Sequence, residues 1–252
     1  MRAILKTIRL EIKNLLFPGL DFCLRQRLKL VKKYLRAGDI KTLDVGCGNG
    51  ALSFLCYSLG NSVTGIDINA DNIDRCRKFA EFKRFPDKLV KFKALNAYNL
   101  SELNGTFDQI LCFEVLEHLL RDKLIIELFT KLLNPQGILH LGVPNLNCPD
   151  YYGERISTYE DGSHVRKGYS YPMIKKILEG YNLAVVKKYG YGGIFTLKVT
   201  VLSRRIGLFL KTLPPHIREA INVFLFLIVY PFTYLDKFSR GEPMSLYIMA
   251  RK

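Results

Sequence analysis

Residues 42–50 read TLDVGCGNG, an apolar segment that leads into three glycines at alternate positions. The residues around Leu43 are typical of a short buried strand, and the glycines begin where such a strand must turn. Gly46, Gly48 and Gly50 allow a tight turn whose amide groups a polar ligand can approach closely. A turn of this kind also occurs with nothing bound, so the loop alone does not establish a ligand site.

Short apolar segments alternate with helical patterns along much of the chain. This alternation predicts an α/β fold in which helices cover both faces of a parallel sheet and the ligand site lies at the carboxyl ends of the strands. A chain of 252 residues suits one such core with additions. We predict strands at residues 42–45, 62–66, 90–95, 108–113, 137–143, 182–189 and 245–250, and a helix from the N-cap Ser170 through Pro172 to Gly180.

The chain is strongly basic, with a formal net charge of +15 at pH 7. Such an excess favours an anionic partner, either nucleic acid, a phospholipid surface or a phosphorylated substrate. The six cysteines are scattered and form no CxxC pair. This pattern is typical of reduced, buried thiols and predicts a cytoplasmic protein without a structural zinc cluster.

Two segments lie outside the predicted core. Residues 1–38 place Lys and Arg between apolar residues at helical spacing, which predicts basic amphipathic helices that are not a secretory signal. Residues 190–243 form an insertion with the apolar run INVFLFLIVYPFTYL, which is shorter than the roughly 20 residues of a membrane span and is broken by Pro231. It is therefore either a buried helix or a segment in the membrane interface, with nearby basic residues Arg204, Arg205, Lys211, Arg218 and Lys237. The predicted core comprises residues 39–189 and a final strand within 244–252.

An acid ends each of two neighbouring predicted strands. Asp67, in the segment GIDIN, lies where a carboxylate can accept two hydrogen bonds from ribose hydroxyls. Asp44 comes directly before the glycine loop, at a position where a dinucleotide site would have to accommodate a diphosphate. A carboxylate there favours a ligand with positive charge.

Five ordered segments between Lys41 and Val143, namely LDVGCGNG, GIDIN, KALNAYNL, FDQILCFEVLEHL and LNPQGILHLGVPN, together resemble the class I S-adenosylmethionine-dependent methyltransferases. The resemblance implies a Rossmann-like, seven-stranded, mostly parallel sheet whose last strand is antiparallel. It also implies that Asn96 stands where the family usually has an acid that contacts the adenine amino group. The cofactor-binding residues that it implies are Asp44, Gly46, Cys47, Gly48, Asp67, Ile68, Asn96, Ala97, Phe113 and Glu114.

The segment CFEVLEHL is similar to a motif in ubiquinone-pathway O-methyltransferases and small-RNA 3′-end methyltransferases. The resemblance implies that Glu114, Glu117, His118 and a downstream histidine, here His164, hold a divalent metal such as Mg²⁺. Such an ion would lower the pKa of an acceptor hydroxyl and orient it. The alternative is that these side chains organise the loop without a metal. His118 and His164 are also candidate general bases, because an imidazole can take the proton of the acceptor.

The sequence thus predicts an enzyme that transfers a methyl group from S-adenosylmethionine to a hydroxyl on a small or lipid-linked acceptor. The basic segments and the apolar insertion predict a cytoplasmic protein that is peripheral on an anionic membrane. Two alternatives remain open: an RNA methyltransferase, and a non-catalytic subunit that binds the cofactor for a partner. The sequence determines neither the acceptor nor the oligomeric state.

Overall fold

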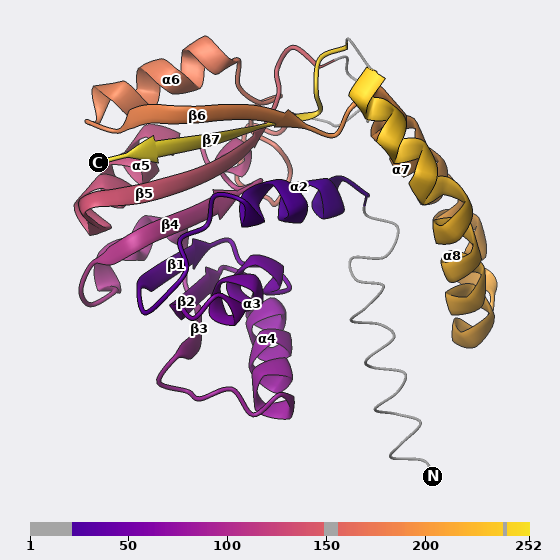
Figure 1. Ribbon diagram of the computed structural model, residues 1–252, viewed down its shortest axis with the longest axis horizontal. Coiled ribbons are helices and arrows are strands. Elements are labelled where there is room, and N and C mark those ends of the chain that lie inside the picture. The colour runs from indigo at the N-terminus through magenta and orange to yellow at the C-terminus, as the bar shows by residue number, and fades with distance from the viewer. Residues whose placement is uncertain (1–21, 149–155, 239–240) are drawn as a thin grey trace. The chain divides into compact units, whose positions relative to one another are not determined.

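The computed structural model describes residues 22–148, 156–238 and 241–252 (Figure 1). The first predicted helix, within residues 1–20, lies outside the described residues. The chain divides into two compact units. The sheet unit comprises Val31–Tyr189 and Ser245–Lys252, and the helical unit comprises Met1–Leu30 and Gly190–Met244. Residues 31–38, which the sequence analysis grouped with the N-terminal segment, belong to the sheet unit.

A seven-stranded sheet forms the centre of the sheet unit, in the order β3-β2-β1-β4-β5-β7-β6. Strand β1 pairs in parallel with β2 and β4, β2 with β3, and β4 with β5, whereas β7 runs antiparallel to β5. The predicted mostly parallel sheet with an antiparallel last strand is therefore confirmed. The strands are β1 Lys41–Val45, β2 Ser62–Asp67, β3 Val90–Ala94, β4 Phe107–Phe113, β5 Leu133–Pro144, β6 Ala184–Tyr191 and β7 Ser245–Arg251.

Local signals determine where the helices begin. Asn69 accepts hydrogen bonds from the backbone N–H groups of Asp71 and Asn72, and Ser170 accepts one from Met173, so both act as N-caps. The α-helices are α2 Phe22–Lys32, α3 Ala51–Ser58, α4 Ala70–Phe82, α5 Asp122–Leu132, α6 Tyr171–Gly180, α7 Ile194–Phe209 and α8 Pro215–Val229. The 3₁₀ helices are η1 Ala97–Glu102, η2 Leu116–His118, η3 Leu210–Thr212 and η4 Tyr230–Phe238.

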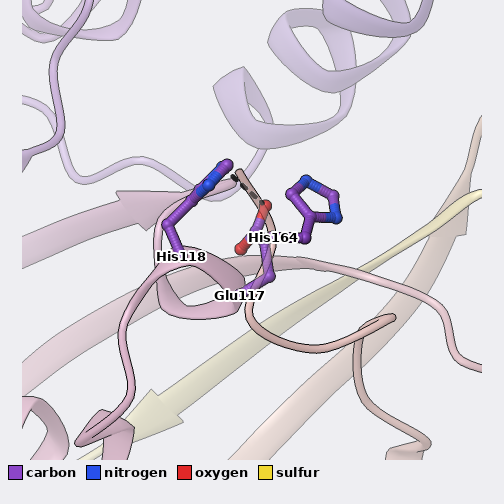
Figure 2. A group of neighbouring side chains, drawn as sticks. All are labelled: Glu117, His118 and His164. Carbon is purple, nitrogen blue, oxygen red and sulfur yellow. Dashed lines mark ion pairs between the residues drawn. The ribbon is translucent and has the colours of Figure 1, made fainter. Parts of the chain in front are cut away.

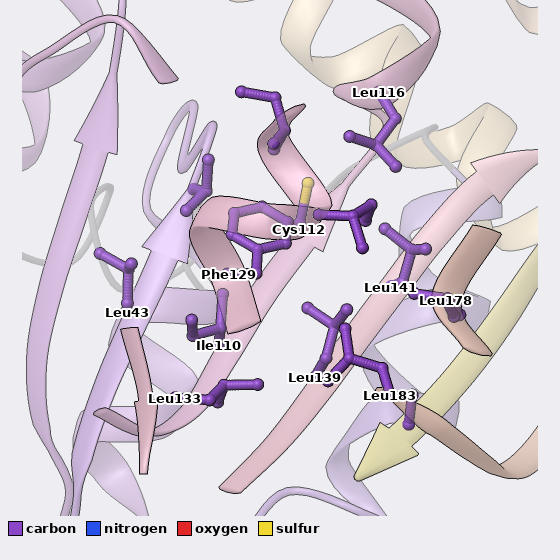
Figure 3. Close-up of a cluster of buried hydrophobic side chains, with 14 of the residues drawn as sticks. Leu43, Ile110, Cys112, Leu116, Phe129, Leu133, Leu139, Leu141, Leu178 and Leu183 are labelled. Atoms are coloured by element: carbon purple, nitrogen blue, oxygen red, sulfur yellow. The ribbon is translucent and has the colours of Figure 1, made fainter. Parts of the chain in front are cut away.

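The main core lies on the central strands of the sheet. Leu43, Ile110 and Leu139 come from β1, β4 and β5 and are fully buried with Phe129 of α5 and Leu178 of α6 (Figure 3). Central parallel strands are covered on both faces, which explains why their sequences read as continuous apolar runs. This packing holds β1 and β4 in place and so positions their carboxyl ends, where the candidate site lies.

The helical unit is built from α7, η3, α8, η4 and the start of α2. The rings of Phe22 and Phe226 stack with centroids 5.8 Å apart, and the Arg25 guanidinium lies 4.4 Å from the centroid of Phe226. The other side of α8 and η4 carries exposed side chains, among them Phe224 and Phe238. The insertion is therefore not a buried core helix.

Candidate functional site

The strand order reverses between β1 and β4, because the strands that follow in sequence lie on opposite sides of these two. A parallel sheet binds its ligand at such a switch point, beyond the carboxyl ends of the two strands. Here the glycine loop follows β1 and Glu114 follows β4. Most of the residues that the sequence singled out belong to these strand ends and to the neighbouring ends of β2 and β3.

The glycine loop needs its glycines for two separate reasons. Gly46, Gly48 and Gly50 have φ angles of +71°, +54° and +77°, a region that other residues rarely adopt. A Cβ on Gly46 would lie 2.3 Å from Cγ2 of Val115, so a side chain has no room there. A Cβ on Gly48 would meet no atom within 4 Å, so the backbone at this point faces open space into which a ligand fits.

Asp67 connects this loop to the end of β2. Its Oδ2 accepts a hydrogen bond from Gly48 N at 2.8 Å, and its Oδ1 accepts one from Asn69 N at 2.8 Å. Oδ1 also accepts a hydrogen bond from Asn72 Nδ2 at 3.4 Å. A carboxylate oxygen can accept two hydrogen bonds, so Oδ2 is the oxygen that keeps capacity for a hydroxyl group of a ligand. The next residue, Ile68, is 73% exposed despite being apolar. A carboxylate beside an uncovered apolar side chain fits a nucleoside, with a sugar on the acid and a flat base on the isoleucine.

The remaining predicted cofactor residues on β1, β3 and η1 are placed differently. Asp44 is buried, and one of its oxygens accepts a hydrogen bond from Ser53 Oγ at 2.6 Å. Cys47 is also buried, and its pKa is raised by a hydrogen bond with the Cys76 thiol and by burial. Asn96 caps η1 by accepting from Tyr98 N at 2.9 Å, and Ala97 is the first residue of that helix.

The end of β4 brings two further predicted residues to the site. Phe113 is buried and its ring stacks on Tyr247, with centroids 6.0 Å apart. Glu114 has a φ of +55°, which is unusual for a residue with a side chain, and its N–H donates to Gly142 O at 3.0 Å. Strained backbone of this kind concentrates at functional sites. No sequence signal indicated it.

Glu117, His118 and His164 form one cluster, in which their potential ligand atoms all lie within 4.8 Å of one another (Figure 2). Glu117 and His118 lie in the short 3₁₀ helix η2, which is separate from α5. His164 comes from the loop before α6. Glu114 is not part of this cluster, so the structure assembles three of the four predicted metal ligands.

The hydrogen bonds of His118 set the direction of its ring. Its Nδ1 lies 3.1 Å from the carbonyl oxygen of Ser163, which only accepts hydrogen bonds. Nδ1 must therefore carry the proton, and in a neutral ring Nε2 then presents a lone pair. That Nε2 lies 3.9 Å from Oε1 of Glu117. Two electron-rich atoms that face each other favour a proton or a cation between them.

Hydrogen bonds and an ion pair connect the loop of residues 156–168, which carries His164, to η2, to the two residues after it and to the start of α5. Val165 N donates to Glu117 O at 2.8 Å. Nη2 of Arg166 donates to the carbonyl oxygens of Leu119 at 2.7 Å and Leu120 at 3.1 Å, while its Nη1 pairs with Asp122.

A second set of hydrogen bonds lies earlier in the same loop. Glu160 Oε1 accepts from Tyr98 Oη at 2.5 Å and from Leu120 N at 2.6 Å. Because Tyr98 belongs to η1, this bond links the loop to the helix that follows β3. Neither set of contacts could be predicted from the sequence, because the partners are distant in sequence and belong to common residue types.

The remaining histidines and the tyrosines between residues 151 and 171 lie in different surroundings. His140 is fully buried and its Nδ1 lies 2.8 Å from Tyr247 Oη, so it is a core residue. Tyr169 is buried and donates to Asp122 at 2.7 Å, whereas Tyr159 is 75% exposed. Tyr151 and Tyr152 lie outside the described residues, and nothing is described for the side chain of His216.

Comparisons with known proteins show which family the chain matches. A family described as a methyltransferase domain matches residues 37–172, more than half of the 252 residues. A ubiquinone biosynthesis O-methyltransferase of Psychrobacter arcticus is 36% identical over 115 residues, which are 44% of this chain and 43% of that protein. The mitochondrial ubiquinone biosynthesis O-methyltransferase of Homo sapiens is 30% identical over 154 residues, 58% of this chain and 42% of that protein.

A solved structure of coclaurine N-methyltransferase has a TM-score of 0.62 at 17% identity and covers 92% of this chain and 72% of that chain. At this identity the likeness shows the fold alone. The matches to the curated relatives span less than half of the length of those proteins. Their substrates therefore do not transfer directly to this chain.

Proposed function

Because this chain belongs to the class I S-adenosylmethionine-dependent methyltransferases, we propose that it methylates a hydroxyl group of a small or lipid-linked acceptor at a membrane surface. The observation that carries the proposal is the combination at the strand ends. Asp67 and the exposed Ile68, which fit a nucleoside, accompany a cluster of one carboxylate and two imidazoles, formed by residues 117, 118 and 164.

The chain's own residues account for cofactor binding. When bound, S-adenosylmethionine supplies a methyl group on a positively charged sulfur, which makes the leaving group a good one. The open backbone at Gly48 admits the amino-acid part, and the carboxylate of Asp67 accepts hydrogen bonds from the ribose hydroxyls. Ile68 covers one face of the adenine, which removes an exposed apolar side chain from water. Asn96 keeps a free lone pair on its side-chain oxygen for the adenine amino group.

In this proposal the imidazoles of His118 and His164 remove the proton from the acceptor hydroxyl. The Nδ1 bond to Ser163 O leaves Nε2 of His118 as the basic atom, and the ring of His164 packs edge-on with centroids 4.7 Å apart. Either ring can take a hydroxyl proton as the methyl group transfers. Removing both imidazoles should abolish methyl transfer and leave cofactor binding in place.

The same cluster also fits a divalent cation. One carboxylate and two imidazoles are ligands typical of Zn²⁺, Fe²⁺ or Mn²⁺, while Mg²⁺ prefers oxygen ligands. Such an ion would lower the pKa of a coordinated hydroxyl. Calorimetric titration of the protein with Mn²⁺, Zn²⁺ and Mg²⁺, repeated on a Glu117→Gln variant, tests this directly.

The names of the relatives support a hydroxyl acceptor, since two of them are ubiquinone biosynthesis O-methyltransferases. A hydroxylated aromatic ring on an apolar tail is the corresponding acceptor class. RNA methylation is the main competing function, and the net charge of +15 favours it. We rank it second because much of that charge lies beside exposed apolar side chains, an arrangement typical of membrane surfaces.

The proposal is tested with labelled S-adenosylmethionine and separate lipid, quinol and RNA fractions. We expect label in the lipid or quinol fraction; label in RNA would support the competing function, and no label would support a non-catalytic subunit. Calorimetry with S-adenosylhomocysteine should show binding that Asp67→Ala weakens at least about tenfold, a loss of roughly 1.4 kcal/mol. Asp71→Ala, an exposed acid in the first turn of α4, is the matched control.

A further inference from the structure

The helix pair α8 and η4 carries an apolar stripe along one side. Most of the exposed residues are three, four or seven positions apart, and Leu227 and Ile228 are adjacent, a spacing that keeps them on one broad face of a helix. Phe224 and Leu227 are each 63% exposed and Phe238 is 81% exposed. The stripe comprises Ile217, Phe224, Leu227, Ile228, Phe232, Leu235 and Phe238.

The opposite side of the same segment is packed inside the helical unit. Phe226 and Tyr230 stack on Phe22, and Arg25 lies over the Phe226 ring. Thr233 is buried. The segment is thus held on one side by its own unit, while the stripe faces outward without cover from the described residues.

The helical unit also carries a large share of the net positive charge of the protein. Its described residues, 22–30, 190–238 and 241–244, contain 9 Lys and Arg against 3 Asp and Glu, so about one quarter of the chain carries +6 of the total +15. Side chains of Lys29, Lys198, Arg205 and Lys237 are exposed. Exposed apolar residues with basic side chains around them fit an anionic phospholipid surface, where each Lys or Arg contributes about 1 kcal/mol.

The segment that carries the stripe is long enough to cross a membrane. Among the described residues, one helical segment, Ala220–Phe238, is long and apolar enough to do so. The chain, however, enters the unit from β6 and leaves it into β7, and these strands are neighbours in one sheet. Both ends therefore stay on the same side of the membrane, which requires an even number of crossings.

Hydrogen bonds also hold the two ends of the insertion together. Met244 N donates to Gly192 O at 2.7 Å, so the two ends of the insertion are joined. Asp236, near the end of η4, accepts from Gln26 Nε2 at 2.9 Å and from Phe195 N at 2.9 Å. These bonds hold the end of η4 beside the start of α7, so the two ends of the insertion stay on one side of the membrane.

We infer that α8 and η4 lie flat in the interface of an anionic phospholipid bilayer and hold the protein on one face of the membrane. The stripe enters the acyl boundary, and the basic side chains contact the headgroups. The inference deepens the proposed function, because it defines the surface at which a lipid-linked acceptor is met. It can fail independently of methyl transfer, since cofactor binding reports on the sheet unit alone.

Vesicle flotation of the intact 252-residue chain tests the inference. We expect flotation with vesicles of phosphatidylcholine and phosphatidylglycerol, and roughly tenfold weaker binding to phosphatidylcholine alone or at high salt. The triple variant Phe224→Ser/Leu227→Ser/Phe238→Ser should lose binding at least about tenfold. The matched control is Phe82→Ser, which removes a 51% exposed phenylalanine from α4 of the sheet unit. Calorimetry with S-adenosylhomocysteine verifies that the sheet unit of each variant is folded, and far-UV circular dichroism verifies that the helix content is unchanged.

Three results would overturn the inference. The first is absence of flotation by a protein that binds S-adenosylhomocysteine. The second is resistance to alkaline carbonate extraction together with proteolysis from the far side of the vesicle, which would show a membrane span. The third is a dimer that the triple variant dissociates while vesicles have no effect, because a second copy would then cover the stripe.

Discussion

Two glycines in one loop are needed for different reasons. At Gly46 a side chain would collide with Val115, whereas at Gly48 the space is open and the φ angle alone restricts the residue. Gly48→Ala should therefore lower the free energy of unfolding by only about 1 kcal/mol. Its added methyl group would fill the space proposed for the cofactor, so we expect S-adenosylhomocysteine affinity to fall at least about tenfold.

Gly38→Ala provides the control for that experiment. Gly38 also has a positive φ, +101°, and a Cβ there meets no atom within 4 Å. It lies before β1, away from the strand ends that carry the site. Chemical denaturation should show a loss of stability for both variants, while calorimetry should show weaker cofactor binding for Gly48→Ala alone. Equal binding by the two variants would contradict the placement of the cofactor.

His140 makes the stability of the protein depend on pH. Full burial lowers its pKa from 6.5 to about 3, so it stays neutral in the folded state while the unfolded chain binds a proton below pH 6.5. Because the unfolded state then holds more protons, the free energy of unfolding falls as the pH drops from 6.5 toward 3, by about 1.4 kcal/mol per unit. At pH 5 this contribution amounts to about 2 kcal/mol.

The variant His140→Asn removes the titrating group and keeps an acceptor for Tyr247 Oη. Urea denaturation at pH 7 and at pH 5 should show a fall in stability that is about 2 kcal/mol smaller for His140→Asn than for the original protein. Identical falls for the two proteins would show that His140 does not titrate on unfolding as its burial requires.

At the scale of elements, the loop of residues 156–168 depends on Arg166. This side chain bonds to Asp122, to Tyr169 Oη at 2.9 Å and to two carbonyl oxygens at the end of η2. Arg166→Met should release the loop and leave the largely buried Asp122 with fewer partners, which lowers stability by about 1–3 kcal/mol. Hydrogen exchange should quicken at Val165 N–H, which donates to Glu117 O.

The control for the loop is Arg77→Met, which removes an arginine from α4 that donates to Phe92 O. It should leave exchange in the loop unchanged. Arg166→Met should also weaken methyl transfer more than S-adenosylhomocysteine binding, because it displaces His164 and not Asp67. A variant that loses cofactor affinity and loop protection together would show that the loop belongs to the cofactor site.

At the scale of the whole molecule, the two units have separate roles. The ends of the insertion are joined by the bond from Met244 N to Gly192 O, so residues 194–242 can be replaced by a short Gly-Ser linker between β6 and β7. We expect the shortened protein to bind S-adenosylhomocysteine as the intact chain does, because the site lies in the sheet unit. It should lose vesicle binding. Loss of both properties would mean that the helical unit is needed for the sheet to fold.

Local chemistry allowed much of the fold to be predicted from sequence. Apolar runs bounded by glycines and prolines marked all seven strands to within a few residues, and Ser170 with Pro172 marked the start of α6. These signals act between neighbouring residues, so they are readable without a structure. Asp67 and the glycine loop were predicted for the same reason, since each lies directly at a strand end.

The tertiary structure decided what depends on contacts between distant segments. It placed His164 beside Glu117 and His118, left Glu114 out of that cluster, and gave Glu114 a strained backbone. It also decided which side of α8 is packed and which is exposed, because that choice depends on Phe22 and Arg25 from the other end of the chain. Sequence thus determined the strand ends that form the site, whereas packing between remote segments determined its chemistry and the surface that faces outward.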